Sequence, residues 1–324
     1  MSIGLTEREV NWQGFIAQEI TPFWQRYHQA IELTTMDGLT QYCATFLHPE
    51  AKRNIILLPG RVETYLKYQE VIYDLFNTQA NVFVIDHRGQ GQSQRMLEDA
   101  EKGYVAHFNH YAEDLEKALA YTRFLDNNLP NSVVAHSMGS AIALNWLHLY
   151  QPKIKKLVLC APMLGINAGL LPQKTAFYIA SVVDCLNRIF RSEPGYFFGQ
   201  VPYHRPDFAD NVLTGSKMRF EYGQDIQAQY KLGGVTTTWL KEALRLINRL
   251  PSQSRFLSCD VLLLQAEKDV VVSLPAQDKW HEYASEFDKN AIKRLVKNAR
   301  HEILMESDDI RAEVITQIRH FLQG

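Results

Sequence analysis

A serine in a short motif is the first residue of this chain that could do chemistry. Ser137 stands in the pentapeptide A-H-S-M-G, after a short apolar run and before a helical pattern. A serine on such a tight strand-to-helix turn exposes its hydroxyl above a sheet, and the turn needs small neighbours two residues to either side. Those neighbours are Ala135 and Gly139, so the motif is A-x-S-x-G. For this pentapeptide alone, an ordinary serine in a βα loop is the alternative interpretation.

An acid and a histidine follow two later strand patterns. Glu267 and Asp269 come after one apolar run, and His301 comes after the next. Polar groups beyond the carboxyl ends of parallel strands meet at one edge of a sheet. A hydroxyl becomes a nucleophile when a base accepts its proton, and the imidazole needs a carboxylate on its other nitrogen. The sequence therefore predicts a triad of Ser137, one of the two acids and His301, in that chain order.

Acyl transfer also needs donors for the negatively charged oxygen that forms in the transition state. The backbone N–H of Met138, at the start of a helical pattern, is the first predicted donor. The backbone N–H of Arg61, directly after Pro59-Gly60, is the second. The alternative is that Gly60 only makes a turn.

Composition restricts the class of protein. The chain has 324 residues, of which 46% are hydrophobic and 22% charged, as in a globular protein with a large core. A net charge of -2 argues against a nucleic-acid partner. Four widely spaced cysteines without a C-x-x-C motif predict reduced thiols in a cytoplasmic protein. His107 and His110 lack a third ligand near them, so no metal and no cofactor is predicted. No uncharged apolar run is long enough to span a bilayer.

The elements that must position these residues follow from the apolar patterns. Residues 1–29 predict an N-terminal arm with a short helix, and the D-G turn at 37–38 predicts a β-hairpin. Buried-strand patterns then alternate with helical ones, which predicts an α/β fold whose mostly parallel sheet has helices on both faces. These strand patterns cover residues 54–58, 82–85, 131–135, 154–160, 261–265 and 292–296.

An insertion interrupts this alternation. Residues 163–255 contain turns and helical stretches but no clear strand pattern, so we expect a cap between two core segments, 30–162 and 256–324. The helical stretch from Lys174 to Phe190 is apolar over more than one face, which suits an acyl pocket or a membrane surface, or complete burial within the cap. Phe198 and Trp239 add apolar bulk and are predicted to contact the substrate.

Taken together, these residues resemble the α/β-hydrolase serine hydrolases of the monoacylglycerol lipase group. The resemblance is greatest to the bacterial lysophospholipases of the L-two type, and it covers the chain from about residue 30 to its end. The stretches that carry it are P-G-R-V-E at 59–63 with Tyr68, D-H-R-G-Q-G at 86–91 with Ser93, A-H-S-M-G at 135–139, A-P-M at 161–163, N-V-L-T at 211–214, L-L-L-Q-A-E at 262–267 and H-E-I-L at 301–304.

The resemblance implies an esterase for single-chain lipids, with the insertion as a cap over the acyl pocket. It places the acid of the triad at Asp269 rather than Glu267. The chain departs from its lipase relatives in having Pro59 before Gly60, where they carry histidine, and Ser140, where they often carry glycine. Neither change removes a catalytic group, but both bear on the substrate.

The hypothesis from sequence is therefore a cofactor-free lysophospholipase with a lipid ester substrate. It would lie in the cytoplasm, with reversible contact to the inner face of the membrane. A monoacylglycerol lipase, or a short-chain esterase or acyltransferase with the same triad, is the alternative enzyme. A non-catalytic binding protein on a hydrolase scaffold is the alternative from another class, and the intact triad counts against it.

Overall fold

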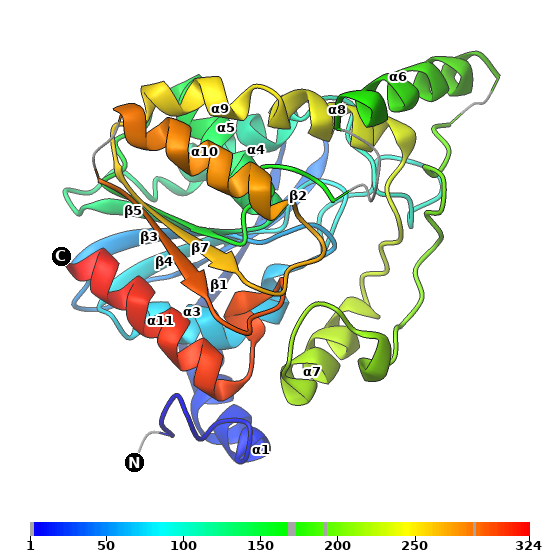
Figure 1. Ribbon diagram of the computed structural model, residues 1–324. Coiled ribbons are helices and arrows are strands. Elements are labelled where there is room, and N and C mark those ends of the chain that lie inside the picture. Colours follow the sequence, from blue (N-terminus) through cyan, green and yellow to red (C-terminus); the bar gives the residue numbers. More distant parts are fainter. Residues whose placement is uncertain (1–2, 168–172, 191–192, 288–289) are drawn as a thin grey trace.

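The protein is an α/β structure built on one eight-stranded sheet (Figure 1). The computed structural model describes residues 3–167, 173–190, 193–287 and 290–324. The strand order is β1-β2-β4-β3-β5-β6-β7-β8, with β1 and β2 antiparallel to their neighbours and the strands from β4 to β8 parallel. The strands are β1 His28–Thr34, β2 Thr40–Phe46, β3 Arg53–Leu58, β4 Ala80–Ile85, β5 Asn131–His136, β6 Lys156–Cys160, β7 Asp260–Ala266 and β8 Ala291–Val296.

The central strands have the apolar composition of a sheet covered on both faces. All six residues of β4 are buried, and in β3 and β5 only the first residue is partly exposed. The β1–β2 hairpin turns at Asp37-Gly38, where Gly38 has a φ of 88°, a conformation that favours glycine. The predicted α/β fold with a mostly parallel sheet is therefore confirmed.

Helices cover both faces of the sheet and divide the core into two layers. Helices α3 and α11 lie on one face, and α4, α5 and α10 lie on the other (Figure 1). Each presents an apolar stripe to the strands, as expected for helices that cover a sheet. These helices are α3 Gln69–Phe76, α4 Asn109–Thr122, α5 Met138–Tyr150, α10 Leu274–Phe287 and α11 Asp308–Gln323.

The predicted N-terminal arm is a helical segment formed by α1 (Trp12–Phe15), a π-helical turn and α2 (Thr21–Tyr27). Trp12, Phe15 and Ile20 form a small buried cluster. Tyr222, from the insertion, packs against this cluster, with its ring centroid 5.5 Å from that of Trp12. The arm therefore joins the insertion to the body of the protein.

The insertion between β6 and β7 forms helices and extended segments beside the carboxyl ends of the strands (Figure 1). Its helices are α6 Gln173–Phe190, α7 Lys217–Gln227, α8 Thr237–Ile247 and α9 Leu250–Gln253. Residues 168–172 and 191–192 of the expected cap lie outside the described residues. Helix α8 packs against α6 and shares the main core with α5. Among the described helices, none has the length and apolarity needed to cross a bilayer.

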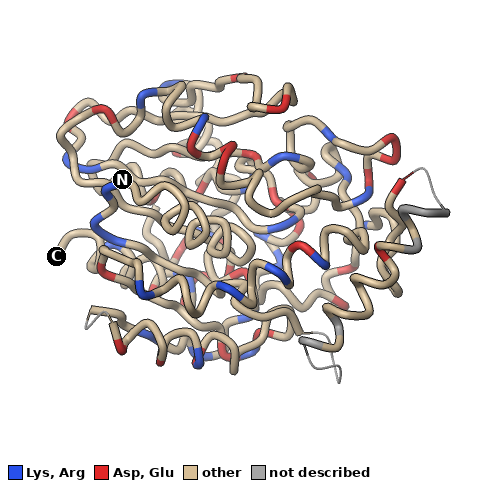
Figure 2. Tube along the Cα trace, turned by 90° about the horizontal axis from the view of Figure 1, so that it is seen from above, with Lys and Arg blue, Asp and Glu red and all other residues tan. Residues whose placement is uncertain are grey.

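A buried ionic network fixes the position of α7. Arg219 of α7 donates from Nε to Glu70 Oε2 at 2.7 Å and from Nη2 to Asp308 Oδ1 at 2.6 Å. Arg311 donates to Asp74 Oδ2 at 2.7 Å, and Arg8 forms two bonds of 2.9 Å with the same carboxylate. Elsewhere, acidic and basic residues are interspersed along the chain (Figure 2). This network ties the arm, the insertion and α11 to α3.

We predict that Arg311→Leu lowers the free energy of unfolding by about 3–5 kcal/mol, because it leaves buried carboxylates without one of their balancing charges. Arg319→Leu is the matched control, since Arg319 also donates to Asp74, at 3.1 Å, but its side chain is 31% exposed. Its loss should cost about 1 kcal/mol or less. Urea unfolding measures both values, and equal effects would contradict the assigned role of burial.

Candidate active site

Ser137 occupies a sharp turn between β5 and α5. Its φ of 49° and ψ of -116° lie outside the regions that L-residues normally adopt, so the backbone is strained there. The turn is possible because α5 starts very close to the end of β3. A Cβ on Gly139 would lie 2.3 Å from the carbonyl oxygen of Leu58 and 2.5 Å from that of Pro59. Glycine is therefore required at 139, whereas the alanine at 135 is accommodated.

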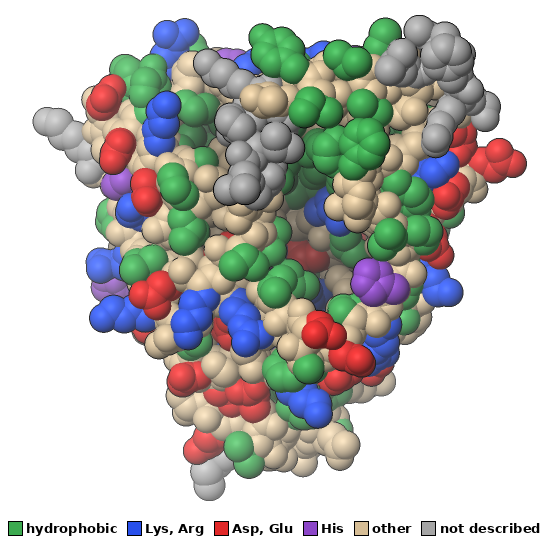
Figure 3. Space-filling model, turned by 45° about the vertical axis from the view of Figure 1, so that its right-hand side comes forward, with side chains coloured by type: hydrophobic (Ala, Val, Ile, Leu, Met, Phe, Trp, Pro, Cys, Tyr) green, Lys and Arg blue, Asp and Glu red, His purple; other side chains and the backbone are tan. Residues whose placement is uncertain are grey.

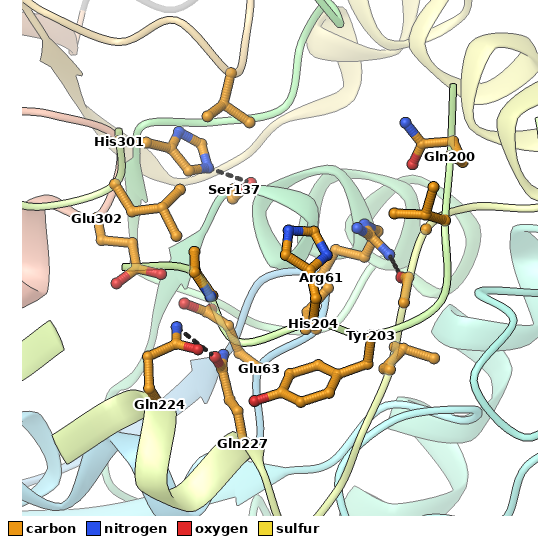
Figure 4. Close-up of a pocket in the computed structure, with 18 of the residues that line it drawn as sticks. Arg61, Glu63, Ser137, Gln200, Tyr203, His204, Gln224, Gln227, His301 and Glu302 are labelled. Atoms are coloured by element: carbon orange, nitrogen blue, oxygen red, sulfur yellow. Dashed lines mark hydrogen bonds between the residues drawn. The ribbon is translucent and has the colours of Figure 1, made fainter. Parts of the chain in front are cut away.

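The structure brings Ser137, His301 and Asp269 into one hydrogen-bonded chain. The Ser137 hydroxyl donates to His301 Nε2 over 2.9 Å (Figure 4), and His301 Nδ1 donates to Asp269 Oδ2 over 2.7 Å. The other carboxylate oxygen of Asp269 accepts from the amides of Val271 and Val272. Burial alone would raise the pKa of Asp269, but the hydrogen bond and charge of His301 and these two amides lower it. Asp269 is therefore held as a carboxylate that orients the imidazole.

Glu267, the other candidate acid, points away from His301. Its side chain is exposed, and Oε2 accepts a hydrogen bond from the backbone N–H of Asn298 at 2.8 Å. The geometry thus favours Asp269 for the role that the resemblance gave it.

The two expected oxyanion donors lie at the turn after β3 and at the first residue of α5. Within the described parts of the chain, the backbone N–H groups of Arg61 and Met138 have no acceptor. The two turns are in contact, because a Cβ on Gly60 would lie 3.1 Å from Ser137 Cβ. Val62, next in the chain, has a φ of 70°, which is rare for a β-branched residue and marks a second strained position.

The buried carboxylate of Glu63 holds the turn after β3 in place. Glu63 Oε2 accepts from the Gly60 N–H and, at 2.5 Å, from the Tyr68 hydroxyl. The same oxygen lies 3.1 Å from His136 Nδ1, and Oε1 lies 3.2 Å from Lys67 Nζ. Glu63 therefore links the turn after β3 to the residue that directly precedes Ser137.

Glu63 and its partners Tyr68, Lys67 and His136 form a cluster, the Glu63 cluster, which also contacts the loop of His301 at two points. His136 Nε2 donates to the backbone carbonyl of His301 at 3.1 Å, and Lys67 Nζ donates to Glu302 at 2.6 Å. Burial opposes charge on Glu63, Lys67 and His136, yet His136 and Lys67 hold the pKa of Glu63 far below its usual range. The Glu63 carboxylate in turn raises the pKa of His136, although burial alone would lower it.

Sequence analysis did not assign a role to Glu63, Lys67 or Glu302. Their place in the sequence could have indicated two of them, because Glu63 and Glu302 fall in the stretches that carry the family resemblance. His136 contacts the Glu63 carboxylate and the backbone carbonyl of His301, which indicates a structural role. His107 is mostly exposed, 3.6 Å from Glu242. In the described residues, no group of three metal-binding side chains is close enough together to hold an ion.

A cavity of about 410 Å³ opens beside Ser137 and His301 (Figures 3 and 4). It lies between the strand ends and the insertion. Most of its exposed wall is apolar, and polar side chains are interspersed in it. The polar lining includes Arg61, Gln200, Tyr203, His204, Gln224, Gln227 and Glu302. The two apolar residues expected to contact substrate do not line it: Trp239 is buried behind Arg61, and Phe198 is 71% exposed.

Comparisons with known proteins identify relatives of this chain. A family described as Serine aminopeptidase, S33 matches residues 49–308. The chain is 31% identical over 320 residues to the Escherichia coli K12 protein named Lysophospholipase L2, covering 97% of this chain and 93% of that protein. It has the same identity to a Haemophilus influenzae protein named "Probable lysophospholipase L2", covering 97% and 98%.

Solved structures share the fold at low sequence identity. A monoglyceride lipase from Saccharomyces cerevisiae has a TM-score of 0.71 and 17% identity, covering 91% of this chain and 94% of its own. A thermostable carboxyl esterase from Bacillus coagulans has a TM-score of 0.74 and 15% identity, covering 92% and 98%. The sheet and helices described above are therefore those of an α/β-hydrolase.

We predict that Glu63→Gln lowers the pKa of His136, because the carboxylate that raises it is lost while the burial that lowers it remains. With Glu63 present, the raised pKa of His136 adds stability below about pH 6.5 that is lost as pH rises through the folded-state value. That pH-dependent part should disappear in Glu63→Gln.

NMR titration of the His136 ring and urea unfolding across pH measure the two effects. Tyr68→Phe is the control, because it removes a hydrogen bond to the same oxygen but no charge. An unchanged pKa of His136 in Glu63→Gln would show that the carboxylate does not control its charge.

Proposed function

This chain belongs to the family described as Serine aminopeptidase, S33, and from that premise we propose that it is a serine hydrolase that cleaves lysophospholipids into a free fatty acid and a glycerophosphodiester. The observation that carries the proposal is the chain of hydrogen bonds from Ser137 through His301 to Asp269, beside an open cavity. Relatives that cover almost the whole chain are named lysophospholipase L2, which supports the choice of substrate.

In the proposed mechanism, Ser137 Oγ attacks the ester carbonyl while His301 Nε2 accepts the hydroxyl proton. Asp269 stabilises the imidazolium that results. The amides of Arg61 and Met138 donate to the oxyanion of the tetrahedral intermediate, and one such donor contributes about 3 kcal/mol in serine hydrolases generally. When the intermediate collapses, His301 gives the proton to the leaving glycerol oxygen.

The second half of the reaction uses the same groups. A water molecule loses its proton to His301 and attacks the acyl-Ser137 ester, and the fatty acid leaves as the proton returns to Ser137. No step needs a metal or a cofactor. The proton moves only between His301 Nε2 and the oxygen atoms of Ser137, the leaving group and water. The imidazole must therefore be held in place at both of its nitrogen atoms.

A monoacylglycerol lipase is the second candidate. The carbonyl chemistry is the same for a neutral ester, and the polar lining of the cavity would also accept a glycerol group. A short-chain esterase or acyltransferase would use the same residues. The family description also names an aminopeptidase, so an amide substrate belongs among the controls.

We also propose that the cap touches a lipid surface reversibly. Exposed apolar side chains lie on α6 and on the segment that borders the cavity, and apolar side chains gather around the hollow in Figure 3. Tyr178 is 69% exposed, Val182 60%, Phe198 71% and Val201 51%. Phe198 would then meet the acyl chain as it leaves the membrane, and Trp239 would support the cavity wall from behind.

The test is catalytic efficiency over p-nitrophenyl esters from acetate to stearate, with lysophosphatidylcholine, monoacylglycerol and an aminoacyl anilide alongside. Burial of each methylene is worth about 0.8 kcal/mol, so kcat/KM should rise roughly fourfold per added buried methylene. Lysophosphatidylcholine should be cleaved and the anilide should not. A maximum at acetate or butyrate, with neither lipid cleaved, would reject the lipid substrate.

A further inference from the structure

The cavity beside Ser137 contains a cationic side chain, Arg61, that no carboxylate among the described residues neutralises. We propose that the Arg61 guanidinium binds the phosphodiester of the lysophospholipid head group, and so selects phospholipid over neutral glycerolipid. The inference rests on the proposed function and names the feature of the substrate that the site recognises. A monoacylglycerol has no such group.

The position of Arg61 is the first argument. Its backbone N–H is one of the two donors placed for the reacting carbonyl, and its side chain lines the cavity that Ser137 and His301 also border (Figure 4). In a lysophospholipid, only the glycerol unit separates the ester from the phosphate. A substrate whose ester lies at Ser137 therefore has its phosphate within the same cavity.

The charge of Arg61 is the second argument. Nη1 donates to the carbonyl oxygen of Gly233 at 3.0 Å, and that is the one hydrogen bond the guanidinium makes to the described residues. Across the same part of the chain, no carboxylate lies within 4 Å of it. Burial lowers the pKa of Arg61 to about 10, which still leaves it charged at neutral pH. A partly buried cation without a counterion is costly, and a bound anion would offset that cost.

The carboxylates of the cavity are already paired. Glu63 and Glu302 face the cavity, but Lys67 lies 3.2 Å from the first and 2.6 Å from the second, and His136 also contacts Glu63. They therefore balance one another and leave the charge of Arg61 uncompensated. In Figure 4 Glu302 and the Arg61 guanidinium lie to the left and to the right of Ser137.

The wall of the cavity offers further polar groups to a head group. The Tyr203 hydroxyl is buried and, among the residues described, has no hydrogen-bond partner. His204 and Gln200 also line the cavity. Arginine presents a planar set of donors that matches two oxygens of a phosphate at once. Arg61 can use Nε and Nη2 in this way while Nη1 keeps its bond to Gly233.

The experiment compares two substrates that differ only in the phosphocholine group. Monomeric octanoyl-lysophosphatidylcholine and monooctanoylglycerol, both below their critical micelle concentrations, are assayed with the native protein, Arg61→Met and Arg61→Lys. The readout is the ratio of kcat/KM for the phospholipid to that for the glycerolipid. We expect the ratio to fall about ten- to a hundredfold in Arg61→Met and less in Arg61→Lys.

Arg205→Met is the matched control. Arg205 lies in the same cap segment as the cavity residues Tyr203 and His204. It is paired with Glu221 and Asp225 on the surface and does not line the cavity. Its loss should leave the ratio unchanged. If both substrates fall together in Arg61→Met, the side chain only supports the oxyanion turn, and the inference is overturned.

Product inhibition distinguishes the two anionic groups that could bind Arg61, the phosphodiester and the fatty-acid carboxylate. Arg61→Met should weaken inhibition by glycerophosphocholine and leave inhibition by octanoate unchanged. Weaker inhibition by octanoate alone would assign the guanidinium to the fatty-acid carboxylate and overturn the inference. If the native protein cleaves neither lipid, the proposed function itself fails. If it cleaves both and the ratio does not respond to Arg61, only the head-group site fails.

Discussion

The strained turn at Ser137 is the constraint on which the rest of the site depends. Its backbone, with a φ of 49°, is held by β5 on one side and by α5 on the other. Such strain persists only where the surrounding structure determines it. The close approach of Gly139 to the end of β3 serves that purpose, and it brings the turn that carries Arg61 against the turn that carries Ser137 and Met138. One backbone contact thus brings together the proposed nucleophile and both proposed oxyanion donors.

A buried cluster of charged side chains holds the three loops of the site in place relative to one another. Glu63 holds the turn after β3, His136 directly precedes Ser137, and the Lys67–Glu302 pair reaches the loop of His301. Because each charge is matched by a neighbour, the cluster can remain ionised while buried. Arg61 is the exception at this site, since it lies at the same turn but pairs with no carboxylate in the described part of the chain. This contrast separates a charge that supports the structure from one that is available to a ligand.

Much of the fold followed from apolar patterns in the sequence. The short buried runs predicted the parallel strands, and polar residues just beyond them predicted which side chains meet at the strand ends. The choice between Glu267 and Asp269 did not follow from spacing, because both leave the same strand; it depends on the turn that sends Glu267 toward Asn298. The Glu63 cluster could not be predicted from periodicity, since its members come from separate loops and meet only when the sheet has formed. The cavity lining was hard to predict for a similar reason: the residues of the insertion that reach it lie in extended segments, whereas Trp239, on a helix, turns into the core.

The central claim is that Ser137 is a nucleophile activated by His301, and labelling with a fluorophosphonate probe tests it most directly. The account predicts a single covalent adduct, located at Ser137 by peptide mass spectrometry, in the native protein. It predicts no adduct in Ser137→Ala, whose thermal unfolding should remain close to that of the native protein. An unlabelled native protein, or an adduct that persists in Ser137→Ala, would contradict the account.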